Sequence, residues 1–280
     1  MPSQKVIKRR LASVRTTRKI MRAMNMVAAS KLQNSKNRLE YARSFLNVCE
    51  EMVTGVRFSA ALKDNPYFAT RNTNASAYFV ISSNRGMCGS FNSNLLDCVS
   101  QHMGENPKNP VIVTLGSKAS EYFYRNGKSV YYKFDELLET AFYEDAVQIS
   151  HYVRNLVTSG MVDEVFVVYT KFESAFVHTP TVMKIMPIDS NHNGNDDIMP
   201  MEYDPDVSTF LDHAIPAYLN TLVYLVMLES NASENAARML NMDSAVNNAS
   251  DIIDKLTRAS NRIRQSAITQ EISEIISGWQ

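Results

Sequence analysis

The chain has 280 residues, 45% of them hydrophobic and 21% charged, a balance ordinary for a globular protein of one or two domains. Its formal net charge of zero hides an asymmetry, because residues 1–39 are rich in Lys and Arg and contain no acid, whereas acids predominate after residue 202. Cys49, Cys88 and Cys98 are too few and too irregularly spaced for a disulfide framework, and we expect reduced cytosolic thiols.

The first predicted element is one long helix over residues 3–54. Apolar residues recur there at alternating spacings of three and four, as in a coiled coil. The stripe consists of Ile7, Leu11, Val14, Met21, Ala28, Leu32, Leu39, Ala42, Leu46, Cys49 and Val53. Only Arg18, Asn25 and Ser35 interrupt it, and Met24 lies just off it, so we expect Met24 to face outwards.

The middle of the chain alternates strand and helix signals. We expect strands at 77–82, 111–115, 130–133, 165–170 and 181–187, and helices at 92–102, 117–125 and 143–159. Such alternation predicts an α/β layer with a mainly parallel sheet. A polar stretch over 189–205 then leads to the last element.

The last predicted element is a helix over about 206–277, with only Pro216 as a breaker near its start. Its stripe consists of Met239, Met242, Val246, Ala249, Ile253, Leu256, Ser260, Ile263 and Ala267. The predicted fold is therefore α/β: a long antiparallel coiled coil of the N- and C-terminal helices with an inserted Rossmann-like domain. Its parts are residues 1–58, 75–190 and 206–280. The last helix is the longer, and we expect its end to project past the start of the first.

No run of 18 apolar residues is present, so we expect no membrane span. The N-terminus lacks the apolar core of a secretory signal. Its Arg-rich, acid-free character would suit a mitochondrial transit peptide, but the stripe continuing unbroken through Leu32 to Val53 argues against removal.

Two local motifs have alternative readings. The turn Arg85–Gly89 follows a strand and precedes a helix, where phosphate-binding loops lie, but its G-x-x-G spacing favours a tight turn that needs glycine backbone angles. Residues 189–194 match the first half of a calcium loop, but Pro200 stands where a bidentate Glu is required, so a turn at Asn193-Gly194 is favoured.

The sequence predicts no catalytic, cofactor-binding or metal-binding set. It contains neither the G-x-x-x-x-G-K-[ST] nor the G-x-S-x-G motif, and its five histidines lack metal-ligand spacing. Two other functions stay open at this point. The basic first helix could bind nucleic-acid phosphates, although no aromatics lie between its cations. The α/β domain could serve a dinucleotide enzyme.

The two ends and the first strand-turn-helix point to a family. The relevant segments are residues 13–20, 23–32, 82–92, 234–239 and 261–272. In this order they resemble the gamma subunits of F-type ATP synthases over the whole chain. Mild departures are Asn25, where a charged residue is common, Asn84, where Asp is common, and Ser90, where Gly is common.

The resemblance implies a rotor without chemistry of its own, which couples ion-driven rotation of the membrane c-ring to ATP synthesis or hydrolysis on the beta subunits. Implied partners are the alpha, beta and epsilon subunits and the c-ring, but no nucleic acid. The implied location is peripheral, on the cytoplasmic face of a bacterial inner membrane, with the mitochondrial matrix face as the alternative. The implied partner contacts are Met24 and Lys31 on the shaft, Arg264, Gln265, Thr269, Gln270 and Glu271 near the tip, and Tyr203 and Asp204 at the foot.

Overall fold

The computed structural model describes residues 4–56, 65–69, 74–134, 141–188, 203 and 206–278. Its elements are α1 (Gln4–Gly55), β1 (Ala75–Ile81), α2 (Phe91–Glu105), β2 (Asn109–Leu115), α3 (Ser117–Arg125), β3 (Val130–Phe134), α4 (Tyr143–Thr158), β4 (Glu164–Phe172), β5 (His178–Met186) and α5 (Val207–Ser277). Contacts group them into two compact units, Met1–Ala29 with Arg238–Gln280, and Ser30–Ala237. Both long helices contribute to both units.

The second unit contains a five-stranded sheet in the order β3-β2-β1-β4-β5. Strands β1 to β4 run parallel, and β5 pairs with β4 in the antiparallel sense. The prediction of a mainly parallel sheet within an α/β domain is therefore confirmed. The chain order reverses between β1 and β4, which is the switch point where open α/β sheets usually bind ligands.

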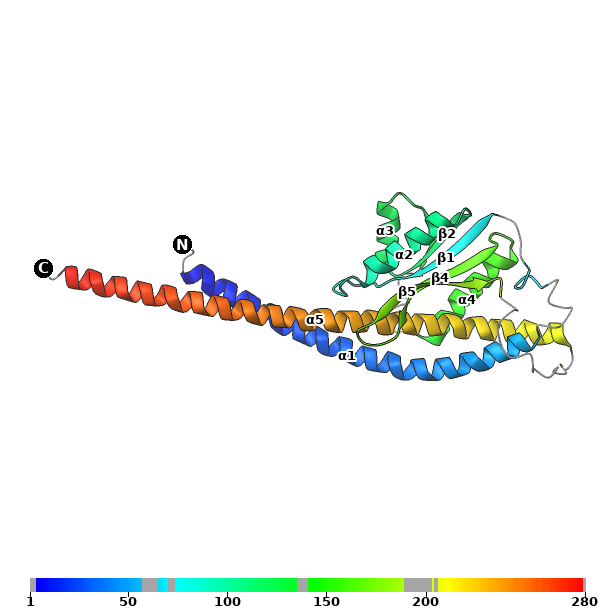
Figure 1. The fold of residues 1–280 in the computed structure, drawn as a ribbon, viewed down its shortest axis with the longest axis horizontal. Helices are drawn as coiled ribbons and strands as arrows, with labels where there is room; N and C mark the ends of the chain where they lie inside the picture. The colour runs from blue at the N-terminus through cyan, green and yellow to red at the C-terminus, as the bar shows by residue number, and fades with distance from the viewer. Residues whose placement is uncertain are drawn as a thin grey trace. The chain divides into compact units, whose positions relative to one another are not determined.

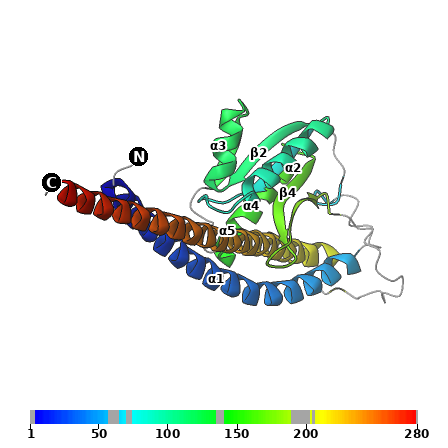
Figure 2. The ribbon, with the colours of Figure 1, turned by 60° about the vertical axis from the view of Figure 1, so that its left-hand side comes forward.

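Alternate residues of the sheet face two separate cores, because successive side chains of a strand point to opposite faces. Tyr78 and Val80 of β1 pack with Leu95 of α2 and Phe123 of α3 in a fully buried cluster. On the opposite face, the ring of Phe79 meets that of Tyr152 of α4 edge to face, at 6.3 Å between centroids. Figures 1 and 2 show α2 and α3 on the face of the sheet that lies away from α5.

The α5 segment of the second unit is a core helix of the domain. It buries apolar residues on nearly all sides, and Leu219, Val226 and Met227 are each at most 1% exposed. Pro216 lies within the helix and does not end it. Further along, the hydroxyl of Ser230 donates to the carbonyl oxygen of Ile81 at the end of β1 (3.4 Å), and that of Ser233 donates to the carbonyl oxygen of Thr170 in β4 (3.1 Å).

By length and composition alone, α5 could cross a membrane, since an apolar window of 18 residues within Val207–Gln270 has a mean hydropathy of 1.2. However, 56% of the apolar window is buried inside the protein. The apolar character of α5 is thus explained by its place in the domain core.

The first unit is a pair of helices, residues 4–29 of α1 and 238–278 of α5. Ile7 and Ala28 of α1 are buried, as are Met242, Ala249 and Ile253 of α5. The burial ends at Ile263, after which every α5 side chain that the structure describes is exposed. The end of α5 extends past the start of α1 (Figure 1), as the predicted helix lengths required.

Candidate partner-binding surfaces

The predicted stripe of α1 forms the interface with α5, and its three polar interruptions each bond to that helix. A guanidinium N–H of Arg18 donates to the hydroxyl of Ser250 (3.3 Å), and the Asn25 amide donates to the carbonyl oxygen of Met239 (2.8 Å). In the second unit, the Ser35 hydroxyl donates to the Asn231 side chain (3.1 Å). Because an apolar stripe alone tolerates sliding, these bonds help to fix the register of the two helices.

Met24 and Lys31 are the predicted contacts on the shaft. Met24 is 37% exposed, and its neighbours Ile20 and Val27 on the same face are 52% and 56% exposed. The outward orientation predicted for Met24 is therefore confirmed. Lys31 lies in the second unit, where it borders a small cavity.

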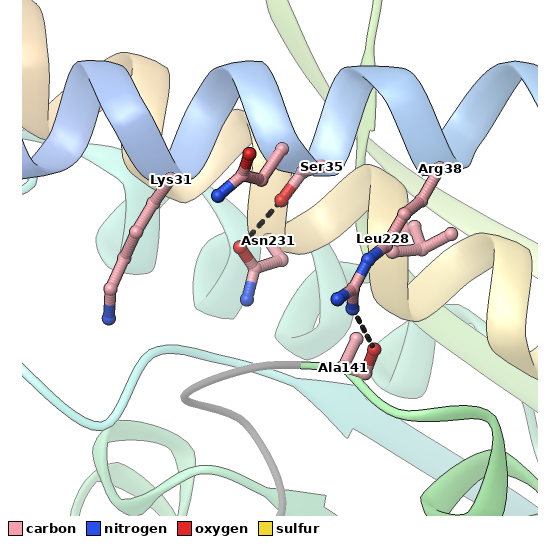
Figure 3. A pocket seen from close by; sticks show the side chains of 7 residues that line it. Lys31, Ser35, Arg38, Ala141, Leu228 and Asn231 are labelled. Atoms are coloured by element: carbon pink, nitrogen blue, oxygen red, sulfur yellow. Dashed lines mark hydrogen bonds between the residues drawn. The ribbon is translucent and has the colours of Figure 1, made fainter.

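The cavity near Lys31 has a volume of about 60 Å³ and lies between α1, α5 and the start of α4. Its lining residues are Lys31, Asn34, Ser35, Arg38, Ala141, Leu228 and Asn231. Figure 3 shows Lys31 and Arg38 on either side of the cavity, with the guanidinium of Arg38 donating to the carbonyl oxygen of Ala141 (3.3 Å). None of these lining residues is acidic, so this surface is suited to a negatively charged group.

The tip of α5 carries most of the predicted contacts. Arg264, Gln265, Thr269 and Gln270 are all exposed. The Thr269 hydroxyl donates to the carbonyl oxygen of Gln265 (2.9 Å), so it is engaged within the helix. The side chain of Glu271 lies outside the described residues. Three isoleucines here are also exposed to solvent: Ile268 by 48%, Ile272 by 51% and Ile275 by 63%.

Tyr203, one of the two predicted foot residues, is less accessible than the tip residues. Tyr203 is half-buried, and its ring packs on that of Phe210 with 4.8 Å between centroids. Its hydroxyl is buried without a hydrogen-bond partner among the described residues, and burial raises the pKa of the phenol. Asp204 lies outside the described residues. The Tyr203 side chain thus packs against α5 of its own chain.

The turn between β1 and α2 is a tight turn, as the sequence favoured. Gly89 has φ +59°, in the left-handed region that glycine adopts without strain, and Met87 has φ +65°. The Asn92 side chain accepts a hydrogen bond from the backbone N–H of Ser83 (3.1 Å) and donates one to the Ser83 hydroxyl (2.7 Å). A side chain of α2 therefore holds the loop closed.

The switch point at the ends of β1 and β4 is occupied by α5 itself. Ser230 and Ser233 bond to carbonyl oxygens of these two strands, at the place where a dinucleotide would lie in an enzyme of this fold. The arrangement argues against the dinucleotide alternative. No cluster of potential metal ligands exists among the residues that the structure describes, and the half calcium loop at 189–194 lies outside them.

A buried polar group near this point was not predicted from the sequence. Glu229 of α5 is 4% exposed and receives a bond from the Arg43 guanidinium of α1 at 2.6 Å. Burial, and then the nearby Glu229 charge, raise the pKa of Tyr169 in β4. The available signal was the polar run 229–235 that directly follows an apolar segment.

Together the fold and these surfaces define a class of protein: one unit is a pair of long helices, the other is an α/β domain with a segment of α5 in its core, and no candidate metal-binding cluster lies among the described residues. The sequence profile of a family described as ATP synthase matches residues 3–280. The ATP synthase gamma chain of Lachnoclostridium phytofermentans is 35% identical, covering 99% of this chain and 98% of its own. That of Desulforamulus reducens is 34% identical with the same coverage. The chain belongs to the ATP synthase gamma chain family.

Solved structures agree in fold. A chain from the Euglena gracilis mitochondrial ATP synthase, in an assembly of OSCP, F1 and c-ring, has a TM-score of 0.70 at 19% identity, covering 99% of this chain and 93% of its own. A chain from the Tetrahymena thermophila mitochondrial ATP synthase central stalk and c-ring has a TM-score of 0.61 at 23% identity, covering 81% of this chain and 99% of its own.

Proposed function

We propose that the chain is the central-stalk rotor of an F-type ATP synthase, which couples c-ring rotation to ATP synthesis or hydrolysis and does no chemistry itself. The observation that carries this proposal is the tip of α5, which continues beyond its partner helix with every described side chain exposed. A single helix that leaves apolar and polar residues open on all sides requires a partner that surrounds it. Family membership supplies alpha and beta subunits as that partner.

The contacts follow from the exposed positions. On the shaft, Met24 and Lys31 meet beta subunits, and the acid-free first helix suits acidic loops on them. At the tip, Arg264, Gln265, Thr269, Gln270 and Glu271 make directional contacts, while the isoleucines form a bearing that centres the helix. Tyr203 and Asp204 belong to the foot near the c-ring, and the α/β domain binds epsilon.

The proposed location is peripheral to the membrane, on the cytoplasmic face of a bacterial inner membrane. The relatives of highest identity named above are bacterial, which favours this face over the mitochondrial matrix. The nucleic-acid alternative has no support among the relatives.

Reconstitution tests this proposal. Purified chain is mixed with alpha and beta subunits, and ATP hydrolysis is measured with and without it. We expect the chain to co-purify with the hexamer and to stimulate hydrolysis. A chain that stays monomeric, does not bind the hexamer and leaves hydrolysis unchanged would contradict the rotor assignment. DNA binding that weakens with salt would instead support the nucleic-acid alternative.

A further inference from the structure

The α1 helix carries a second stripe, and nothing in the described part of the chain covers its apolar half. Tyr41 is 80% exposed, Phe45 53%, Val48 50% and Met52 42%. These four residues again alternate spacings of four and three. The same spacing continues backwards through Arg38, Asn34 and Lys31, which line the cavity in Figure 3. We call the set Lys31, Asn34, Arg38, Tyr41, Phe45, Val48 and Met52 the second stripe.

The second stripe is distinct from the interface with α5. The buried residues Leu46 and Cys49 follow Phe45 and Val48 by one position, which is about 100° around the helix axis. A helix face open to water is normally polar, so four apolar side chains in a row on such a face indicate a binding surface. Phe142, 51% exposed at the start of α4, extends it, because the Arg38 guanidinium lies 5.9 Å from the centre of its ring.

We propose that the second stripe docks one amphipathic α-helix of another subunit, about twenty residues long, with an acidic side chain at the end that meets the cavity. The inference rests on the proposed function, because it places the partner in the same enzyme. The stripe covers 22 residues, or about 32 Å of helix. Spacings of three and four match a helical ligand, whereas an extended strand would require a period of two.

Charge complementarity supports the acidic end. Lys31 and Arg38 are the charged members of the stripe, and no acid is among the described residues that line the cavity between them. Arg38 uses one N–H on the carbonyl oxygen of Ala141, and a guanidinium has further donors for a carboxylate.

The same charges argue against a second copy of this chain as the partner. Parallel pairing of two such stripes would place Lys31 and Arg38 against their own counterparts. Antiparallel pairing about the stripe centre would place Lys31 against Met52 at both ends, burying an ammonium on an apolar side chain with no acid to pair with it. A different helix, apolar where this stripe is apolar and acidic where it is basic, avoids both problems.

Cysteine labelling in the complete enzyme tests the proposal. Val48→Cys reports on the second stripe, and Asn47→Cys is the matched control, because Asn47 is exposed on the same turn but faces away from both stripes. Each variant is labelled with a maleimide as isolated chain and within the complete enzyme, and the parent chain gives the background from its own cysteines. We expect Val48→Cys to react about tenfold more slowly in the enzyme, which corresponds to about 1.4 kcal/mol of docking free energy. Asn47→Cys should react at an unchanged rate.

Cross-linking from cysteines placed at 45, 48 and 52, followed by mass spectrometry, identifies the partner. Contacts spaced by three or four residues on another subunit support the proposal. Contacts spaced by two, contacts with a second copy of α1, or equal labelling in both states would overturn it. ATP hydrolysis by the same preparations separates the two claims: a coupled enzyme with an unprotected Val48→Cys contradicts only the docked helix, whereas failure to assemble contradicts the rotor as well.

Discussion

The ion pair between Arg43 and Glu229 provides a direct test of how α1 is held on the domain core. The Arg43 side chain is 48% exposed, but that of Glu229 is only 5% exposed. One Glu229 oxygen takes the 2.6 Å bond from Arg43, and the other is buried without a hydrogen-bond partner among the described residues. The two partners should therefore respond very differently to removal.

Arg43→Ala leaves a buried carboxylate without its partner. Breaking a fully buried pair in this way costs about 3 to 5 kcal/mol. Because water reaches the guanidinium and already screens the pair, we take a lower figure of about 2 kcal/mol of unfolding free energy. Glu229→Met, in contrast, leaves a half-exposed guanidinium that water can solvate. It removes the carboxylate oxygen that lacks a partner, but it also removes the side-chain hydrogen bond to the buried Tyr169 phenol. We expect it to cost about 1 kcal/mol.

The double variant separates this explanation from a simple loss of packing. With both charges gone, its unfolding free energy should be close to that of Glu229→Met alone, which gives a coupling of about 2 kcal/mol, the whole cost of Arg43→Ala. The measurement is urea unfolding of all four chains followed by far-UV circular dichroism. As a control, Lys118→Ala, which breaks an exposed pair on α3, should leave the unfolding midpoint unchanged.

Two results would refute the reasoning. One is a Glu229→Met variant that is destabilised as much as Arg43→Ala, since the asymmetry of exposure would then not matter. The other is a double variant whose loss equals the sum of the single losses within about 0.4 kcal/mol, because the two residues would then act independently.

Three further predictions concern the turn at Gly116, stability at acid pH and the end of α5. Gly116→Ala should lose about 2 kcal/mol or more of unfolding free energy in a urea titration, because φ is +96° there and a Cβ would clash with the carbonyl oxygen of Ser82. Gly86→Ala is the control: its Cβ would meet open space, so its unfolding free energy should stay within about 0.5 kcal/mol of the parent value. Glu164→Gln should lose less stability than the parent between about pH 5 and 3, measured by thermal melts. Burial alone would raise the pKa of Glu164, but its hydrogen bonds to Lys184 and Lys108 lower that pKa overall. The ionised Glu164 therefore stabilises the fold above its unfolded pKa of about 4.3, and this stabilisation disappears as the pH falls. If the variant and the parent lost stability equally over this range, a stabilising role of ionised Glu164 would be excluded. Deleting residues 272–280 should weaken assembly while leaving folding and measurable ATP hydrolysis intact, because these residues continue a helix end that is already exposed; loss of all rotation in intact complexes, observed on single molecules, would contradict a bearing role.

Much of the fold could be predicted because its signals are local. The alternating spacing in α1 identified the buried stripe, and the prediction of 117–125 coincides with α3, which is followed by Asn126-Gly127. Strand order was less accessible, since it depends on pairing between distant segments. The antiparallel direction of β5 arises from its short connection to β4, which the sequence analysis did not interpret.

The burial of polar residues in α5 was harder to predict from the sequence than the order of the strands. A run such as Glu229–Asn235 normally indicates a solvated helix face, yet Glu229, Ser233 and Asn235 are each at most 4% exposed. Ser233 finds its partner at the end of β4, Glu229 finds its partner in Arg43 of α1, and both are tertiary contacts that a local pattern does not reveal. Asn235 bonds to Asn231 within α5 itself. For the tip the limit is different. Arg264 and Gln265 are exposed, but exposure alone does not identify the surface that meets them.

The long separation between paired residues affects how the protein is made. Ser35 and Asn231 lie 196 residues apart in the chain, Asn25 and Met239 lie 214 apart, and Arg18 and Ser250 lie 232 apart. At about 5 to 20 residues per second, a ribosome takes roughly 10 to 40 s to add the intervening chain. Throughout that interval the apolar stripe of α1 has been synthesised and its partner helix has not. The α/β domain also remains incomplete, since α5 fills its core. The nascent chain therefore exposes a helix-length apolar surface until synthesis is nearly complete, and it is the last quarter of the protein that allows the first quarter to fold.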